Sequence, residues 1–102
     1  MKELLRELCQ VPGISGFEEE IRACIAEKIR PHVQDMKVDA VGNLIAWKAG
    51  WRKAKNELLI TAHMDEVGFI VKRVDDKGYI RFAPIGGIDR RTVIGKKVLV
   101  GK

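Results

Sequence analysis

The first third of the chain has the spacing of apolar residues that is typical of helices. A short amphipathic helix is predicted from three leucines that share one face: Leu4, Leu5 and Leu8. A longer helix is predicted after it, because apolar side chains repeat every four residues: Phe17, Ile21, Ile25 and Ile29. Pro31 is expected to end this helix, since the residue before a proline is pushed out of the helical region.

A capping box is predicted at the start of the longer helix. In this arrangement the Ser15 hydroxyl accepts the backbone N–H of Glu18, and the Glu18 carboxylate returns the bond to the backbone of Ser15. Acidic residues at positions 18–20 also suit the positive end of the helix dipole.

Beyond Pro31 the pattern changes to that of strands. A hairpin is predicted from Met36–Val38 and Leu44–Trp47, which flank a turn at Asp39–Asn43. The run Leu58–Ala62 is apolar throughout, which is typical of a strand covered on both faces in an α/β sheet.

The last third predicts a second group of short strands. They are expected at Phe69–Val74, Tyr79–Phe82 and Val98–Val100, with a turn at Asp75–Gly78, a loop at Pro84–Gly87 and no further helix. Two helices followed by many short strands indicate an α/β fold class, with part of an α/β layer followed by the opening of a small β domain.

Composition narrows the class of protein. The 102 residues are 46% hydrophobic and 32% charged, which suits a small folded domain rather than a disordered chain. No apolar run approaches the roughly 18 residues of a membrane span, and the N-terminus alternates charge with leucine, unlike a signal peptide. A cytoplasmic protein is therefore expected, with Cys9 and Cys24 as reduced, buried thiols rather than zinc ligands.

The net charge of +5 raises the hypothesis of nucleic-acid binding. The basic run Lys48–Lys55 contains Trp51, which would be available for base stacking. No recognition helix or RNA-binding motif accompanies the run. A solvated surface loop is therefore the favoured interpretation, and no nucleic-acid partner is expected.

The most conspicuous chemistry follows the apolar run, at His63, Asp65 and Glu66. Ligand sites of open α/β sheets lie at the carboxyl ends of strands, so an imidazole here is placed to bind a metal. Asp65 would accept the other ring N–H and fix the tautomer. The alternative is that His63 caps the strand and both acids are solvated turn residues, because a catalytic zinc needs about three protein ligands.

Four motifs in order resemble the family of tetrahedral (TET-type), dodecameric dinuclear metalloaminopeptidases, some of which carry the label endoglucanase. The first is Val11–Glu18, which resembles the family's P-x-x-S-G-x-E turn into a long helix. Asp39–Leu44 resembles its D-x-x-G-N turn, and Phe82–Gly87 resembles its F-x-P-x-G-G loop. Leu59–Phe69, which carries the histidine, closely resembles the corresponding stretch of the family.

The resemblance implies a peptidase that removes N-terminal residues from peptides with two divalent metal ions, zinc or cobalt, per subunit. It implies that His63 is a metal ligand and that Asp65, the catalytic candidate, orients its ring. Residues 1–66 would then be the N-terminal portion of a three-layer αβα catalytic domain. Residues 67–102 would begin an inserted PDZ-like β-barrel domain used in dimerisation. A homo-oligomer, dodecameric as in the family, is implied as well.

Family members are roughly three times longer, and their remaining ligands would lie beyond position 102. The chain is therefore expected to be an N-terminal fragment that alone binds no metal stably and turns over no peptide. His32 matches no family ligand and is expected to be a surface or capping residue. The alternative is a non-catalytic chain with only an oligomerisation or interaction role. Because Leu58–Ala62 would lack its neighbouring strands, the chain is also expected to be marginally stable and to associate.

Overall fold

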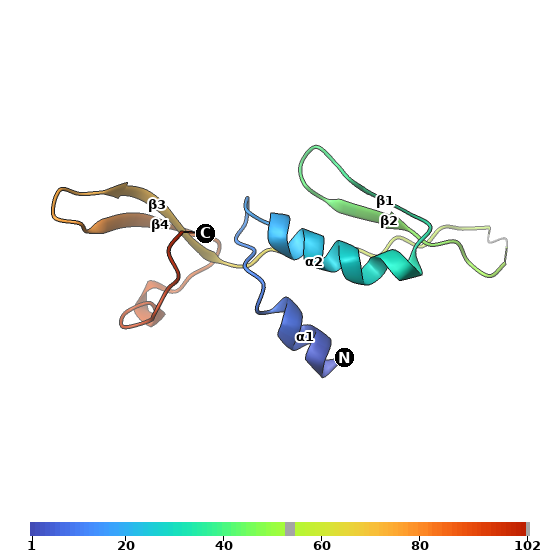
Figure 1. Cartoon of the computed structure of the whole chain (residues 1–102), viewed down its shortest axis with the longest axis horizontal. Helices are drawn as coiled ribbons and strands as arrows, with labels where there is room; N and C mark the ends of the chain where they lie inside the picture. The colour runs from blue at the N-terminus through green and yellow to red at the C-terminus, as the bar shows by residue number, and fades with distance from the viewer. Residues whose placement is uncertain (53–54, 102) are drawn as a thin grey trace. The chain divides into compact units, whose positions relative to one another are not determined.

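The computed structural model describes residues 1–52 and 55–101. The chain forms two compact units, Met1–Glu66 and Val67–Lys102, and each is described by itself (Figure 1). Over the described residues we find no helix that is both long enough and apolar enough to cross a membrane.

The first unit begins with the two helices that the sequence predicts. Helix α1 spans Lys2–Leu8 and helix α2 spans Glu19–Ile29. A 2.7 Å salt bridge between Lys28 and Glu7 joins the two helices. Helix α2 ends where Pro31 is expected to end it, and one 3₁₀ turn, Arg30–His32, follows.

The predicted hairpin of the first unit is also present. Strands β1 (Asp35–Val38) and β2 (Leu44–Trp47) pair antiparallel. In the turn between them, the Asp39 carboxylate accepts the backbone N–H groups of Val41 and Asn43, at 3.0 and 2.9 Å. Gly42 in this turn has a positive φ of 92°, a conformation that glycine adopts readily.

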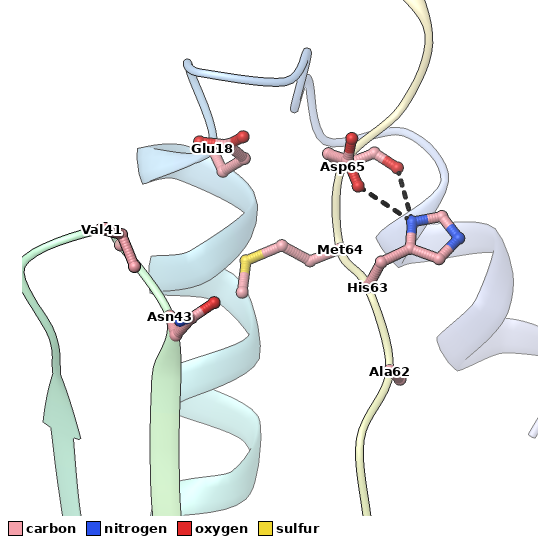
Figure 2. A pocket seen from close by; sticks show the side chains of 8 residues that line it. Glu18, Val41, Asn43, Ala62, His63, Met64 and Asp65 are labelled. Carbon is pink, nitrogen blue, oxygen red and sulfur yellow. Dashed lines mark hydrogen bonds and ion pairs between the residues drawn. The ribbon is translucent and has the colours of Figure 1, made fainter. Parts of the chain in front are cut away.

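Helix α2 holds the hairpin turn through one side chain. The Arg22 guanidinium donates from Nη1 to the Gly42 carbonyl over 3.2 Å. Because the turn and the helix are thereby joined, the turn lies close to the first turns of α2 (Figure 2).

The chain at residues 13–15 is hydrogen-bonded to Glu66. Ile14 and Glu66 form a parallel bridge, in which the Glu66 N–H donates to the Gly13 carbonyl over 2.8 Å. The Ser15 N–H donates back to the Glu66 carbonyl over 3.4 Å, and the Glu66 carboxylate accepts the Gly13 N–H at 3.3 Å. Gly13 contacts Ile21 of α2, and these are the two buried residues among those described.

The second unit is a hairpin followed by a short 3₁₀ turn. Strands β3 (Gly68–Val74) and β4 (Ile80–Ile85) pair antiparallel, with a bulge between Val71 and Arg73. Phe69 and Phe82 pack edge to face across the strands, with ring centroids 4.9 Å apart. The two predicted strands are confirmed, although β4 extends into the expected loop as far as Ile85, and Arg90–Thr92 adds a 3₁₀ turn where no helix was expected.

Two other predicted strands are wrong. Leu58–Ala62 and Val98–Val100 have no regular secondary structure. A strand needs a partner to satisfy its backbone N–H and C=O groups, and the described residues form only two two-stranded sheets, β1–β2 and β3–β4. Leu58, Leu59 and Ile60 are consequently 85%, 85% and 82% exposed rather than buried. The observed fold is therefore a mixed arrangement of helices and antiparallel hairpins.

The capping box and the buried thiols are also contradicted. Helix α2 has Glu18 as its N-cap and no side-chain cap bond, and the Glu18 carboxylate accepts the N–H of Gly16. The Ser15 hydroxyl donates to another segment instead of accepting from Glu18. Cys9 and Cys24 are free thiols as predicted, but Cys9 is exposed and Cys24 is only half-buried.

Candidate functional site

His63 and Asp65 contact each other at the end of the exposed apolar run. The His63 Nδ1 lies 3.0 Å from the Asp65 Oδ1 and 3.1 Å from the Asp65 backbone carbonyl (Figure 2). Both partners of this nitrogen are acceptors when the carboxylate is ionised, so Nδ1 carries the ring hydrogen. The contact that the sequence suggested is therefore present, while the roles of the two residues in chemistry stay predictions.

This contact leaves the other ring nitrogen available. With the hydrogen on Nδ1, the neutral ring has a lone pair on Nε2, which is the form of histidine that binds metals. Figure 2 shows Nε2 directed away from Asp65, and the His63 side chain is 86% exposed. The His63 imidazole therefore fits the role of one ligand of a metal centre.

The second carboxylate oxygen of Asp65 is bonded by Ser15, a residue predicted to cap helix α2. The Ser15 hydroxyl donates to the Asp65 Oδ2. This hydrogen bond and the one to His63 hold the pKa of the Asp65 carboxyl below its usual value, because both stabilise the ionised form. The contact between Ser15 and Asp65 could not be predicted from a local sequence pattern, since the two residues are 50 positions apart.

The segment that carries His63 also lines a pocket, together with the β1–β2 turn and Glu18. Side chains alternate along an extended chain, so Met64 points toward Asn43 and Glu18 while His63 points away from them (Figure 2). The pocket has a volume of about 140 Å³ and is lined by Glu18 together with residues 41–43 and 62–65. It brings the turn of the β1–β2 hairpin and the start of α2 next to the candidate ligand.

The described residues bring no full set of metal ligands together next to His63. Within residues 1–52 and 55–101, no group of three or more His, Cys, Asp or Glu residues is arranged to hold a metal ion. His32 is exposed, in the 3₁₀ turn after α2, in keeping with a surface position. In the basic run, Lys53 and Ala54 lie outside the described residues, while Trp51 is fully exposed in a loop.

Comparison with known protein families identifies residues 42–102 as matching the model of the M42 glutamyl aminopeptidases. The chain is 46% identical to a putative aminopeptidase of Acetivibrio thermocellus over 98 residues, covering 96% of this chain and 29% of that protein. It is 34% identical to the lysyl aminopeptidase of Pyrococcus furiosus over 97 residues, covering 94% of this chain and 27% of that protein.

Solved structures give the same assignment. A protein of Thermotoga maritima described as an endoglucanase superposes with a TM-score of 0.79 at 46% identity, over 85% of this chain and 28% of that one. An aminopeptidase of Desulfurococcus kamchatkensis superposes with a TM-score of 0.81 at 33% identity, over 88% of this chain and 25% of that one. The chain thus spans about a quarter of the length of its relatives. It belongs to the M42 family of aminopeptidases.

Proposed function

We propose that this chain supplies one corner of a dinuclear metalloaminopeptidase that removes N-terminal residues from peptides. The observation that carries the proposal is the His63 ring, with Nδ1 bonded to Asp65 and Nε2 free, within a segment that resembles the family. His63 would bind one metal through Nε2. Asp65 would orient the ring and, by accepting the Nδ1 hydrogen, raise the basicity of the coordinating nitrogen.

The family implies divalent metals, for which we propose zinc or cobalt. When bound, they would act as Lewis acids on the scissile carbonyl and lower the pKa of the attacking water. The chain's own residues contribute binding and orientation only, since the described part gathers no further ligand set. We propose that the other ligands come from the portion of the relatives that this chain does not span.

The larger architecture is proposed on the same basis. Residues 1–66 would be the N-terminal portion of a three-layer αβα catalytic domain, and residues 67–102 would begin an inserted PDZ-like β domain. The exposed run Leu58–Ala62 would become a central strand once neighbouring strands are present. A cytoplasmic homo-oligomer, dodecameric as in the TET-type enzymes, and peptide substrates complete the proposal.

A chimera tests the function directly. The first quarter of the Acetivibrio thermocellus relative would be replaced by residues 1–102, and the purified protein assayed for metal content and release of N-terminal amino acids from short peptides. We expect metal binding and turnover with Zn²⁺ or Co²⁺. His63→Ala should remove both, because one metal loses its imidazole ligand.

His32→Ala is the matched control, since it removes the chain's other histidine from an exposed position. This variant should keep full metal content and turnover. A chimera that folds but is equally active with and without His63 would contradict the proposed role. An oligomeric chimera that never binds metal would favour the alternative, a chain with only an assembly role.

A further inference from the structure

We propose that Ser15 is a positioning residue for the candidate metal site: its hydroxyl fixes the Asp65 carboxylate, which in turn keeps the His63 hydrogen on Nδ1 and leaves Nε2 free. The inference rests on the proposed function for its purpose, but the coupling itself concerns three side chains that are already in contact. It assigns Ser15 a role that its local sequence did not predict.

The two oxygens of Asp65 are used for different partners. Oδ2 accepts from the Ser15 hydroxyl, and Oδ1 accepts from the His63 ring. The side-chain torsion that turns a carboxylate is soft, with broad wells. The Asp65 side chain is 39% exposed, so water competes for both oxygens. A bond at each end fixes the plane of the carboxylate, and the loss of either bond frees it to rotate.

Ser15 is itself held in place by backbone bonds. Its N–H donates to the carbonyl of Glu66, the residue after Asp65, and the Gly13–Glu66 pair adds two more hydrogen bonds to the same bridge. The hydroxyl therefore reaches Asp65 from a segment that is itself hydrogen-bonded to the residue after Asp65. This is the arrangement expected of a residue that orients a ligand through a second side chain.

If the Ser15 hydroxyl served the stability of helix α2 instead, its removal would have a different effect. If Ser15 served only to start helix α2, its removal would fray the helix. The N-cap of α2 is Glu18, with no side-chain cap bond from Ser15. Removing the hydroxyl should therefore leave the helix intact and alter the imidazole instead.

The tautomer of His63 can be read directly in the 102-residue chain. The sequence has only two histidines, His63 and His32, so ¹⁵N spectra of the imidazoles in alkaline buffer give one reference ring and one test ring. In the unmodified chain, we expect His63 to show the Nδ1-protonated form and His32 the mixture of a solvated ring. Ser15→Ala should move His63 toward the His32 pattern, and Ser15→Thr, which keeps a hydroxyl, should restore it.

Thr92→Ala is the matched control, because it removes a hydroxyl that donates to the Asp89 carbonyl in the second unit. It should leave the His63 spectrum unchanged. Either of two results overturns the proposal: a His63 ring that matches His32 in the unmodified chain, or one that is unaffected by Ser15→Ala while α2 remains folded.

Measuring the metal affinity of the chimera distinguishes a failure of the Ser15 proposal from a failure of the proposed function. Ser15→Ala should weaken Co²⁺ binding by about tenfold, at the lower end of the effect of residues that orient a ligand, and Ser15→Thr should recover it. A parent chimera that binds no metal would refute the proposed function, while the tautomer result would still decide the role of Ser15. Unchanged affinity in Ser15→Ala would overturn the positioning role.

Discussion

Gly13 and Ile21 are packed so closely that a methyl group has no room between them. A Cβ built on Gly13 would stand 2.7 Å from the Ile21 Cγ2 and 3.2 Å from its Cβ. Ile21 is 4% exposed, so the isoleucine has little space into which it can move. This contact sets how near the Gly13–Ser15 segment lies to helix α2, and therefore where Ser15 meets Asp65.

Gly13→Ala is expected to destabilise the first unit by about 1–3 kcal/mol, the usual cost of overpacking a closed site. Urea unfolding followed by circular dichroism measures the change. Gly87→Ala is the matched control, because a Cβ there meets nothing within 4 Å and its φ lies outside the left-handed region. Equal unfolding midpoints for the two variants would contradict the packing argument.

Asp65→Asn should weaken metal binding by the chimera about 10- to 100-fold, the range seen when a group that orients a ligand is altered. The amide keeps the size of the side chain but presents one donor group where the carboxylate presents two acceptors. It can therefore no longer accept from Ser15 and His63 together. Co²⁺ titration followed by visible absorption measures the affinity.

Asp89→Asn is the comparison for Asp65→Asn, since Asp89 lies in the second unit and bonds Arg91 locally. It should leave Co²⁺ affinity as it was. A similar loss of affinity in both variants would point to general destabilisation of the protein and count against an orienting role for Asp65.

The β1–β2 turn should loosen in acid. Bonds from the side chain and backbone of Asn43 hold the pKa of the Asp39 carboxyl below its usual value. A lowered pKa means that the ionised group adds stability above its unfolded pKa, about 3.9, and that this contribution is lost as pH falls through the folded pKa. The amide shifts of Val41 and Asn43 should therefore change cooperatively below about pH 4.

Asp39→Asn should remove that acid transition, because no carboxylate is left in the turn to titrate. Asp76→Asn, at the exposed tip of the other hairpin, should leave it in place. Persistence of the same transition in Asp39→Asn would assign it to another group.

The exposed run Leu58–Ile60 should make the isolated chain associate. Three neighbouring apolar side chains, each more than four-fifths exposed, form a surface that proteins ordinarily cover. Sedimentation velocity should show species larger than the monomer, and Leu59→Lys should reduce them. A single monomer boundary with cooperative melting of the unmodified chain would refute this prediction.

The same run should behave differently within the chimera. If strands from the relative pair with it, the amides of residues 58–62 become protected from hydrogen exchange, whereas in the 102-residue chain they exchange freely. Free exchange in both proteins would contradict the proposed central strand.

The sequence alone determined the helix and the hairpin whose hydrogen bonds join residues close to each other along the chain. The repeat from Phe17 to Ile29 with Pro31 after it predicted α2, and two strand-like stretches around the turn at Asp39–Asn43 predicted the β1–β2 hairpin. Helix bonds and tight turns join residues that are near each other in sequence, so short patterns carry their information. His63 and Asp65, two positions apart, were brought into contact for the same reason.

Only the tertiary structure determined the partners of polar groups that can hydrogen-bond either to nearby residues or to distant ones. Ser15 carries the local signature of a helix cap, yet its hydroxyl donates to Asp65, because the hydrogen bonds between Gly13, Ser15 and Glu66 bring the Asp65 carboxylate within its reach. Leu58–Ala62 has the composition of a buried strand but none of its structure. A strand's hydrogen bonds and cover come from other segments, so apolar sequence alone cannot form one.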